Sequence, residues 1–450
     1  MGETVLFDSG SGEGCGREER TAASRIGPRR LRQAVRNQVT FQQCSLDELL
    51  PEEHEARIVW EYVSGMDLSE LEGEIQAVEG GPGQAPADPR ILLGLWLWAT
   101  LRGVGSAREL NRLCEYHAAY RWMCGEVTMN YHTLSDFRTG HVELLDRMLS
   151  ESVASLMAEG LVTLERVAQD GVKVRASAGA GSFRRQPTLE EALAAAEEQV
   201  ACLRKELERD PGASKTRRQA ARERAAAERV ERIRAALSQL PEIAERKKAK
   251  ERAKARASTT DADARVMKMG DGGYRPAFNV QLATATDSQV ITGVDVTNAG
   301  GDQGQLVPMV EQHAERYEEK PKEVLADGGF VKKSDIDELG PPRGGTTVYA
   351  PVMESKDPER DAHTPCADDS PAVAEWRQRM GREEAKAIYR ERASTAECVN
   401  AQVRNRGLRQ FLVRGLRKVK AVVLWYALAH NLKRAFALRG AASQMAACSG

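Results

Sequence analysis

Two aspartates follow short apolar segments with the pattern of β-strands, and each aspartate is followed by glycine. Asp170 comes after Val167-Ala168-Gln169, and Asp327 comes after Val324-Leu325-Ala326. Both carboxylates could therefore lie on the same rim of a sheet, with space for a ligand beside the glycines. Mg²⁺ prefers carboxylate oxygens, and two such ions about 4 Å apart can activate an attacking oxygen and stabilise a leaving one. An Asp-Gly pair at a strand end is also an ordinary turn, so a purely structural role stays open.

A third carboxylate would complete such a metal site, and the helix predicted over residues 385–406 offers two candidates. Glu391 and Glu397 are six residues apart, so they face different sides of an α-helix. Arg390, Glu397 and Arg404 recur every seven residues on one stripe. Guanidinium groups on both sides of Glu397 could then grip phosphate oxygens, which favours Glu397. A surface stripe without a catalytic role would have the same spacing.

The charges are unevenly distributed along the chain. The 450 residues exceed what one hydrophobic core usually supports, and their formal net charge is only -1. From Cys398 to Gly450, however, there is no Asp or Glu and there are ten Lys or Arg residues. This stretch could lie along a polyanion, or it could be a solvated face balanced by acidic neighbours in the fold.

The cysteines and the apolar segments bear on the compartment of the protein. The eight cysteines form no CxxC pair, and no Cys/His cluster has zinc-ligand spacing. We therefore expect neither a disulfide framework nor a structural zinc site, as fits a reducing cytoplasm. The N-terminus lacks a signal pattern, and the most apolar run, residues 91–99, is too short to cross a bilayer. We expect a cytoplasmic protein without membrane contact.

The first third of the chain has a helical pattern. We predict a helical N-terminal domain over residues 38–160, in which Ser106-x-x-Glu109 is a capping box that begins one helix. A further short helix is expected to begin near Thr133, so residues 106–140 could form a helix-turn-helix. Such a pair could bind DNA, or it could be part of a purely structural bundle.

Strand patterns appear after residue 160. They predict an α/β domain over residues 161–440, built on a mixed sheet. Its predicted strands cover residues 162–168 with a continuation to 176, 278–283, 289–296, 323–326 and 346–350. A helix is predicted over residues 302–317, and a long helical segment is predicted from Pro371. Tails are predicted at residues 1–37, with little fixed structure, and at 441–450.

Residues 184–257 interrupt this domain after its first strand. They are rich in Ala, Glu, Arg and Lys, with thin apolar stripes and a break at Asp210-Pro211-Gly212. The pattern predicts an inserted helical hairpin. Its mixed charges favour a solvated antiparallel pair, although the basic end over residues 246–256 could also contact phosphate.

Several motifs resemble one protein family. The segment Tyr389-Arg390-Glu391-Arg392-Ala393-Ser394-Thr395-Ala396-Glu397, with Arg414-Gly415-Leu416 and Ala429-His430-Asn431-Leu432 after it, resembles the Y-R-E-K region of bacterial insertion-sequence DDE transposases. The segments around Asp170-Gly171 and Asp327-Gly328 resemble the two aspartate segments of that family. Residues 88–138 are similar to its helical N-terminal domain, so the resemblance spans about residues 45–438.

The resemblance implies a ribonuclease-H-like mixed sheet and metal-dependent DNA strand cleavage and transfer. Asp170, Asp327 and Glu397 would be the catalytic residues and the ligands of two Mg²⁺ ions, for which Mn²⁺ may substitute. Arg404 takes the place of the family's lysine and keeps its charge. The DNA-binding residues would be Tyr389, Arg392, Arg404, Arg406, Arg409, Arg414 and Lys173.

The implied partners are the terminal inverted repeats of the element and target DNA. A homodimer or higher oligomer would hold two ends together, in a bacterial cytoplasm and associated with the nucleoid. Two alternatives stay open. One is a catalytically inactive DNA-binding protein derived from a transposase, and the other is a ribonuclease-H-like nuclease without strand transfer.

Overall fold

The computed structural model describes residue 39 and residues 45–77, 85–209, 217–354 and 360–449. The chain divides into two units, residues 1–44 and 45–450, and every described helix and strand lies in the second. The predicted tail over residues 1–37 and the predicted break at Asp210-Pro211-Gly212 therefore lie outside the described residues. None of the described helices is both long enough and apolar enough to cross a membrane.

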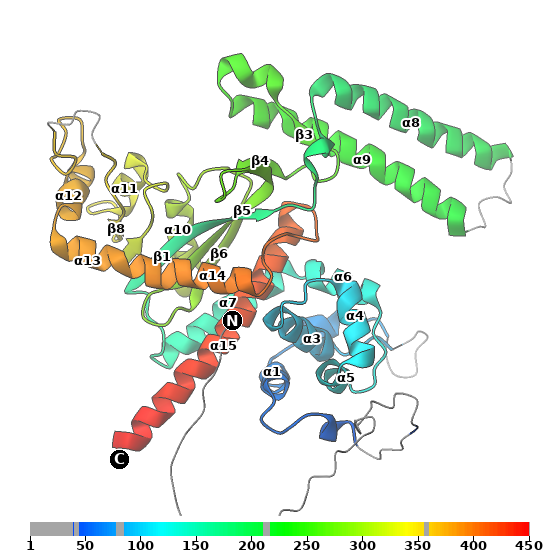
Figure 1. Ribbon diagram of the computed structural model, residues 1–450, viewed down its shortest axis with the longest axis horizontal. Helices are drawn as coiled ribbons and strands as arrows, with labels where there is room; N and C mark the ends of the chain where they lie inside the picture. Colours follow the sequence, from blue (N-terminus) through cyan, green and yellow to red (C-terminus); the bar gives the residue numbers. More distant parts are fainter. Residues whose placement is uncertain (1–38, 40–44, 78–84, 210–216, 355–359, 450) are drawn as a thin grey trace, which may run out of the picture. The chain divides into compact units, whose positions relative to one another are not determined.

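A mixed sheet with β1 at its centre organises the C-terminal two thirds of the chain (Figure 1). On one side, β1 pairs antiparallel with β5, which pairs antiparallel with β6 and, beyond the end of β6, with β4. On the other side, β1 pairs parallel with β7, and β7 pairs parallel with β8. The strands are β1 (Arg166–Arg175), β4 (Arg265–Lys268), β5 (Tyr274–Ala285), β6 (Ile291–Thr297), β7 (Glu323–Leu325) and β8 (Thr347–Tyr349).

This sheet confirms the predicted α/β class and the predicted hairpin, which is β5 and β6. The pattern did not predict β4. A small second sheet, β2 (Phe183–Arg184) with β3 (Ala257–Ser258), joins the two ends of the inserted segment. Between them, α8 (Gln186–Arg209) and α9 (Arg217–Glu245) pack on each other around Leu189, Val230 and Ile233, as the predicted helical hairpin requires.

Helices cover the sheet and carry the predicted third carboxylate. They are α10 (Leu306–Tyr317), α11 (Lys333–Leu339), α12 (Pro371–Met380), α13 (Glu383–Arg392), the π-helical turn η5 (Ala393–Glu397), α14 (Cys398–Asn405) and α15 (Leu416–Ser449). The turn η5 lies against β1 and β5. Helix α15 continues through Ser449, into the residues that were predicted to be a tail.

The N-terminal helical region is confirmed. Its helices are α1 (Glu55–Ser64), α2 (Ser69–Gly73), α3 (Pro89–Leu101), α4 (Ala107–Tyr116), α5 (Ala118–Cys124), α6 (Tyr131–Gly140) and α7 (Val142–Ala158). Ser106 caps α4 by accepting from the backbone N–H of Glu109, as predicted. Residues 106–140 form three short helices rather than a pair. Arg138 on α6 is buried, with its guanidinium 4.7 Å from the ring centre of Trp96. Its side chain is therefore part of the packed core.

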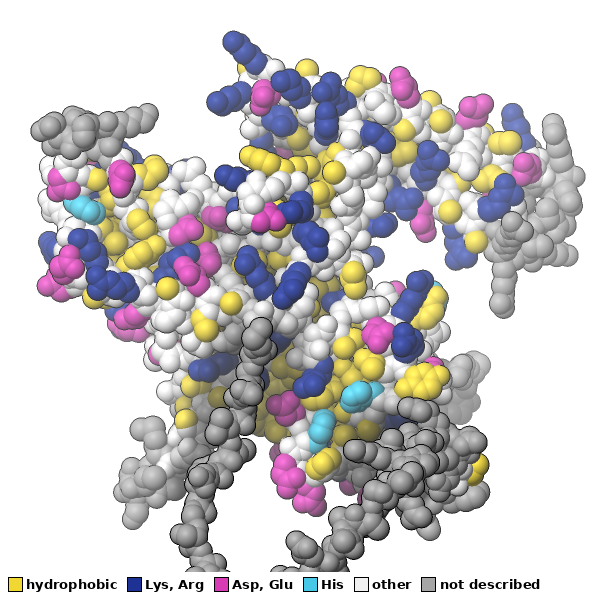
Figure 2. Space-filling model, in the orientation of Figure 1, with side chains coloured by type: hydrophobic (Ala, Val, Ile, Leu, Met, Phe, Trp, Pro, Cys, Tyr) yellow, Lys and Arg dark blue, Asp and Glu magenta, His cyan; other side chains and the backbone are white. Residues whose placement is uncertain are grey.

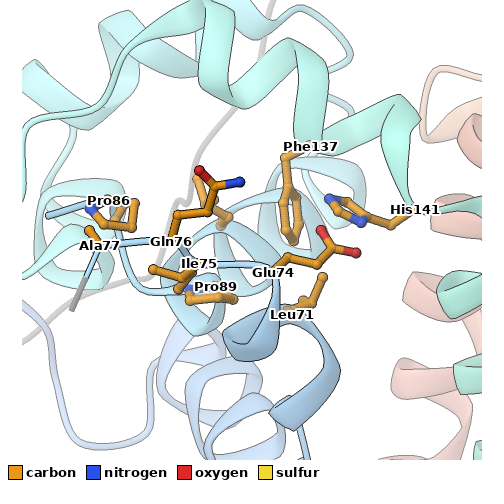
Figure 3. Close-up of a pocket in the computed structure, with 11 residues that line it drawn as sticks. Leu71, Glu74, Ile75, Gln76, Ala77, Pro86, Pro89, Phe137 and His141 are labelled. Carbon is orange, nitrogen blue, oxygen red and sulfur yellow. The ribbon is translucent and has the colours of Figure 1, made fainter. Parts of the chain in front are cut away.

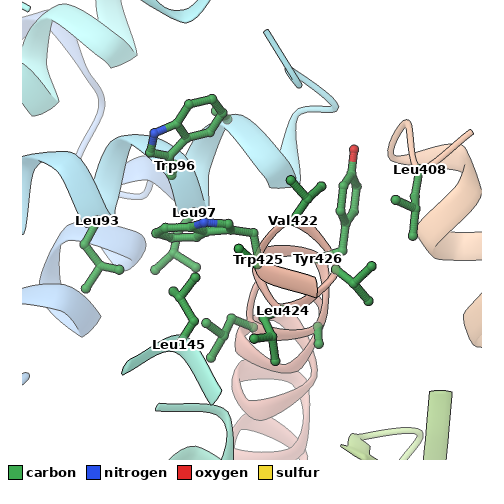
Figure 4. Packing of buried hydrophobic residues seen from close by; sticks show 14 of the residues in the cluster. Leu93, Trp96, Leu97, Leu145, Leu408, Val422, Leu424, Trp425 and Tyr426 are labelled. Atoms are coloured by element: carbon green, nitrogen blue, oxygen red, sulfur yellow. The ribbon is translucent and has the colours of Figure 1, made fainter. Parts of the chain in front are cut away.

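One hydrophobic core joins the two predicted domains across residue 160. Trp96 of α3 and Trp425 of α15 have ring centres 6.5 Å apart, and Leu97 and Leu145 lie beside them (Figure 4). The indole N–H of Trp425 donates to the carbonyl of Arg138 at 3.0 Å. The core continues to β5 and β6 through α15, which contacts both β6 and the N-terminal helices. The N-terminal helices therefore do not form a separately packed body within the described residues.

Two buried histidines make stability depend on pH. Burial lowers the pKa of His313 and of His430 from 6.5 to about 4. In the unfolded chain both imidazoles become protonated near pH 6.5, whereas in the folded chain they do so only near pH 4. The contribution of the two neutral histidines to the free energy of unfolding is therefore complete above pH 6.5. It is lost as the pH falls towards 4, by about 1.4 kcal/mol per pH unit for each histidine.

Chemical denaturation at pH 7 and pH 5 checks this. The wild type should have the lower midpoint at pH 5, and His313→Asn, whatever its own stability, should show a smaller difference between the two pH values. Equal midpoints for the wild type at the two pH values would contradict the expectation.

Candidate active site

The three predicted carboxylates surround the guanidinium group of Arg392. Nη2 of Arg392 lies 3.1 Å from Oδ1 of Asp170 and 3.8 Å from Oδ2 of Asp327. Nη1 lies 2.7 Å from Oε1 of Glu397. Residues that are far apart in the sequence therefore meet at one place, where the structure puts a positive charge among three negative ones.

Neighbouring parallel strands bring the two aspartates together. Ala168 of β1 is the register partner of Leu325 of β7, so Asp170 and Asp327 each lie two residues beyond paired positions. Asp327 lies just past the end of β7, where its Oδ1 accepts from the backbone N–H of Gly329 at 2.7 Å. The expected meeting at one rim of the sheet is explained by this parallel pairing.

Asp170 does not end its strand. β1 continues to Arg175, and Asp170 lies opposite Leu282 of β5. The predicted continuation of the strand beyond Gly171 is therefore confirmed as far as Arg175. The glycine is needed for packing, because a Cβ on Gly171 would collide with Oδ1 of Asp302. The space for a ligand that was expected beside Gly171 is therefore not present. The space beside Gly171 is filled by the Asp302 carboxylate.

The π-helical turn η5 determines which cation lies beside Glu397. A π-helical turn holds one residue more than an α-helical turn and is frequent at functional sites. It follows Arg392 directly and ends at Glu397, so the seven-residue stripe predicted for an unbroken α-helix does not form. Nη2 of Arg390 instead lies 3.9 Å from Glu383. Among the described residues, Arg392 is the cation within 4 Å of Glu397, rather than Arg390 or Arg404.

The alternative third carboxylate, Glu391, has a different environment. Both of its oxygens accept from Nη1 of Arg166, at 2.7 and 2.8 Å. Arg166 also pairs with Glu323 at 2.6 Å. Glu391 therefore belongs to an ion-pair network at the start of β1, and Glu397 is the glutamate beside the aspartates.

The charges at the site perturb one another. Burial raises the pKa of Asp170 above its usual value, and the nearby Asp327 adds to this, while Arg392 and Asn400 oppose it. Burial alone would lower the pKa of Arg392, but the surrounding carboxylates keep it above the usual value, so Arg392 is charged. Burial raises the pKa of Tyr389, which also feels Asp327 and Glu397. Three carboxylates against one guanidinium leave the site with excess negative charge.

This donor set fits divalent metal ions. Carboxylate oxygens are the ligands that Mg²⁺ prefers, and the site already accommodates a cationic group between them. A second acidic group, Cys366, Asp368 and Asp369, has ligating atoms within 4.8 Å of one another. There Asp369 is already paired with Lys333 and with Arg377, each at 2.7 Å, so most of its charge is neutralised. The three carboxylates around Arg392 are the better candidates.

Asn400 is a residue of this site that the sequence pattern did not indicate. Its Nδ2 donates to Oδ2 of Asp170 at 2.7 Å. It lies three residues after Glu397, one helical turn along α14, and is buried. The spacing of three from a candidate glutamate is the signal that could have identified it, because residues three apart share a helix face.

The predicted DNA-binding residues divide into groups. Tyr389 and Arg392 lie at the carboxylates.

Another group is exposed at the far end of β1. There the backbone N–H of Arg175 donates to the carbonyl of Arg409 at 3.3 Å. Nε of Arg414 donates to the carbonyl of Ser177 at 3.3 Å. Nε of Arg409 also donates to the carbonyl of Arg404 at 3.3 Å. The exposed arginines Arg175, Arg404, Arg409 and Arg414 are called the basic end cluster below. Figure 2 shows several Lys and Arg side chains together near the middle of the viewed face.

Two predicted DNA-binding residues lie outside both groups. Arg406 is partly buried, and its Nη1 lies 3.2 Å from Nδ1 of His430. Burial lowers the pKa of Arg406. Lys173 is on the opposite face of β1 from Asp170, because side chains alternate along a strand, and its Nζ lies 4.0 Å from Asp302. Both cations therefore have partners within the protein.

A cavity of about 600 Å³ lies elsewhere, between the N-terminal helices. Its lining includes Leu71, Ile75, Pro89, Phe137 and His141 (Figure 3). None of its lining residues is a predicted site residue. The chemistry expected from the carboxylates therefore does not belong to this cavity.

Comparison with known proteins gives two family matches. Residues 44–140 match the family model described as "Transposase domain (DUF772)", and residues 356–436 match the one described as "Transposase DDE domain". The second match includes Arg392, Glu397 and Asn400, whereas Asp170 and Asp327 precede it. No curated protein and no solved structure matches the chain.

Proposed function

Because the chain is an insertion-sequence DDE transposase, we propose that it binds the terminal inverted repeats of its element and catalyses metal-dependent strand cleavage and strand transfer. The single observation that carries this proposal is the meeting of Asp170, Asp327 and Glu397 around Arg392. A homodimer or higher oligomer would hold the two ends of the element, in a bacterial cytoplasm and close to the nucleoid.

The sheet is proposed to be a ribonuclease-H-like core. The support is its strand order, β6-β5-β1-β7-β8, with an antiparallel hairpin on one side of β1 and two parallel strands on the other. In this arrangement one aspartate lies on the central strand and the other lies just past the end of the first parallel strand. A helix that crosses the sheet carries the glutamate, and its turn η5 contacts β1.

Asp170, Asp327 and Glu397 would hold two Mg²⁺ ions, or Mn²⁺ in their place. When bound, such ions activate the attacking oxygen and stabilise the leaving oxygen of a phosphodiester. Asp170 is held before any ligand arrives, because its oxygens accept from Asn400, Arg392 and the backbone N–H of Gly171. Because Asn400 and the Gly171 N–H already orient this carboxylate, Asp170 itself need not reorient as charge develops.

Arg392 has to move away from the carboxylates when metal ions bind. Its side chain is only 11% exposed, whereas that of Glu397 is 55% exposed, so the site opens to solvent on the Glu397 side. A guanidinium released towards that opening can bind a phosphate through two parallel hydrogen bonds. We propose that Arg392 neutralises the carboxylates in the free protein and contacts the DNA backbone in the complex, beside Tyr389.

The basic end cluster is proposed to hold the DNA backbone farther along β1. Each phosphate contact made by Lys or Arg releases counterions, so binding weakens as salt rises. Replacing Arg404, Arg409 and Arg414 one at a time by Gln is expected to weaken binding of any DNA sequence and to lower the slope of log K against log salt by about 1 each. Fluorescence anisotropy with a labelled duplex at several salt concentrations measures this.

Arg417→Gln is the matched control for that series. Arg417 is exposed on the neighbouring helix, but its Nη2 is paired with Glu143 at 2.6 Å. It should change the slope less than the three cluster variants do. An unchanged slope in all three would show that the basic end cluster does not contact DNA.

A plasmid assay tests the proposed function as a whole. The purified chain is incubated with Mg²⁺ and a supercoiled plasmid that carries the terminal inverted repeats of the element. A transposase should nick at the ends of the repeats and give joined products. An inactive DNA-binding protein would shift the DNA without cutting it, and a ribonuclease-H-like nuclease would cut without joining. Either of these results would replace the proposal by the corresponding alternative.

A further inference from the structure

We infer that Asn400 is a positioning residue, which holds the carboxylate of Asp170 in the orientation that binds metal ions. The inference rests on the proposed function, because it assigns a task to a residue that contacts a proposed metal ligand. It concerns a side chain that touches neither metal nor DNA directly and acts through Asp170.

Three hydrogen bonds fix the carboxylate of Asp170. Oδ2 of Asp170 accepts from Nδ2 of Asn400 at 2.7 Å. Oδ1 accepts from the backbone N–H of Gly171 at 3.0 Å and from Arg392 at 3.1 Å. If Arg392 leaves when metal ions bind, Asn400 and the Gly171 N–H are the contacts that still set the direction of the carboxylate. Among the described residues, Oδ2 is held by the side chain of Asn400.

Glu397 and Asn400 are close together on the same helical segment. Glu397 immediately precedes α14 and Asn400 lies in its first turn, so one short stretch of helix carries both a proposed metal ligand and the group that holds another. The turn η5 sets the rotation of this stretch and lies against β1 and β5. A displacement of the helix would therefore change the positions of the Glu397 and Asp170 carboxylates together.

The amide of Asn400 is buried and only partly hydrogen-bonded. Asn400 is only 6% exposed, and its Oδ1 is a buried atom without a hydrogen-bond partner among the described residues. An unsatisfied buried polar atom lowers stability, so leucine, which has a similar volume, would be the better choice for packing alone. The negative charge of Asp170 fixes the amide with Nδ2 towards the carboxylate and Oδ1 away from it. The side chain is thus placed for donation to Asp170 rather than for stability.

The experiment measures Mn²⁺ binding to the full chain by electron paramagnetic resonance at constant pH, for the wild type and Asn400→Leu. Groups that orient metal ligands typically change metal affinity by about 10–100-fold when they are removed. We expect the Kd for Mn²⁺ to rise by about that factor in Asn400→Leu. The Mn²⁺ concentration that gives half-maximal DNA cleavage should rise in parallel, and excess Mn²⁺ should restore much of the rate.

Asn431→Leu is the matched control, because Asn431 is a buried asparagine of α15 whose amide bonds the backbone N–H and C=O of Ile291 at 2.8 and 2.7 Å. It should lower the melting temperature and leave the Kd for Mn²⁺ unchanged. If Asn400→Leu does not fold, Asn400→Ala is measured in its place, with the same expected rise. An unchanged Kd in the folded variant overturns the positioning role.

The failure of the proposed function would look different. If the wild type binds no Mn²⁺, or if Asp170→Asn binds it as tightly as the wild type does, the metal site itself is wrong and the role of Asn400 falls with it. If Asp170→Asn weakens binding but Asn400→Leu does not, the metal site stands and only the positioning role is overturned.

Discussion

Alanine in place of Asp170, Asp327 or Glu397 is expected to lower Mg²⁺-dependent cleavage by about a thousand-fold or more, while the affinity for the ends of the element changes little. Each carboxylate lies within 4 Å of the Arg392 guanidinium, so each would contribute to the same pair of metal ions. When several residues act as one catalytic unit, the enzyme loses most of its activity if any one of them is removed. The measurement is the single-turnover cleavage rate, with gel-shift titrations for binding.

The double variant Asp170→Ala/Asp327→Ala should be little worse than either single variant, for the same reason. Glu391→Ala is the matched control, because it removes a carboxylate from the same helical segment. That carboxylate is bonded to Arg166 and is not at the site. The Glu391→Ala variant should retain a cleavage rate well above that of the three site variants. Cleavage at the wild-type rate by all three site variants would refute the assignment.

Arg392→Gln is expected to have opposite effects on metal binding and on catalysis. Without DNA, the variant should bind Mn²⁺ at least about tenfold more tightly, since a competing ion pair worth about 1.4 kcal/mol changes a binding constant by that factor. Its cleavage rate should nevertheless fall by about a hundred-fold, because the contact with phosphate is lost. Metal titration and single-turnover cleavage on the same preparation give both values.

Arg392→Lys separates charge from shape. Lysine keeps the positive charge that competes with metal ions but lacks the planar fork of guanidinium. Its affinity for Mn²⁺ should lie between those of the wild type and Arg392→Gln, while cleavage stays impaired. Weaker Mn²⁺ binding by Arg392→Gln than by the wild type would show that Arg392 supports the metal site instead of occupying it.

The aspartates of the site could be predicted because local patterns determined them. The apolar runs before Asp170 and Asp327 indicated strands, and neighbouring parallel strands place equivalent positions side by side. The continuation of the strand past Asp170 was also predicted, and Val172 to Arg175 do pair with β5. The surroundings of Gly171 could not be predicted in the same way. Whether a glycine marks a turn or a close contact depends on Asp302, which is distant in the sequence.

The surroundings of Glu397 depended on a feature without a sequence pattern. The stripe of Arg390, Glu397 and Arg404 assumed an unbroken α-helix, and the turn η5 changed the rotation of the helix between the first two. Asn400 was missed for a related reason: its spacing of three from Glu397 was the available signal, but the contact with Asp170 depends on how the helix is placed over β1. Choosing Glu397 over Glu391 remained possible because the family resemblance extended through this segment.

Tertiary packing explains the other differences. Helix α15 comes from the end of the chain but packs on α3 and α7, so the predicted boundary at residue 160 does not separate the core. Burial of Arg138 beside Trp96 could not be seen from a charge pattern, because it depends on where α3 lies. The partial burial of Arg406 has the same kind of cause, since its partner His430 lies on α15.

The most direct test of the three-carboxylate site is anomalous diffraction from crystals of the chain bound to DNA of the element's end and soaked in Mn²⁺. We expect two manganese peaks about 4 Å apart, coordinated by Asp170, Asp327 and Glu397, with Arg392 turned away from them. Manganese bound only at Cys366, Asp368 and Asp369, or a site in which Arg392 still lies among the carboxylates while the DNA is cut, would contradict it.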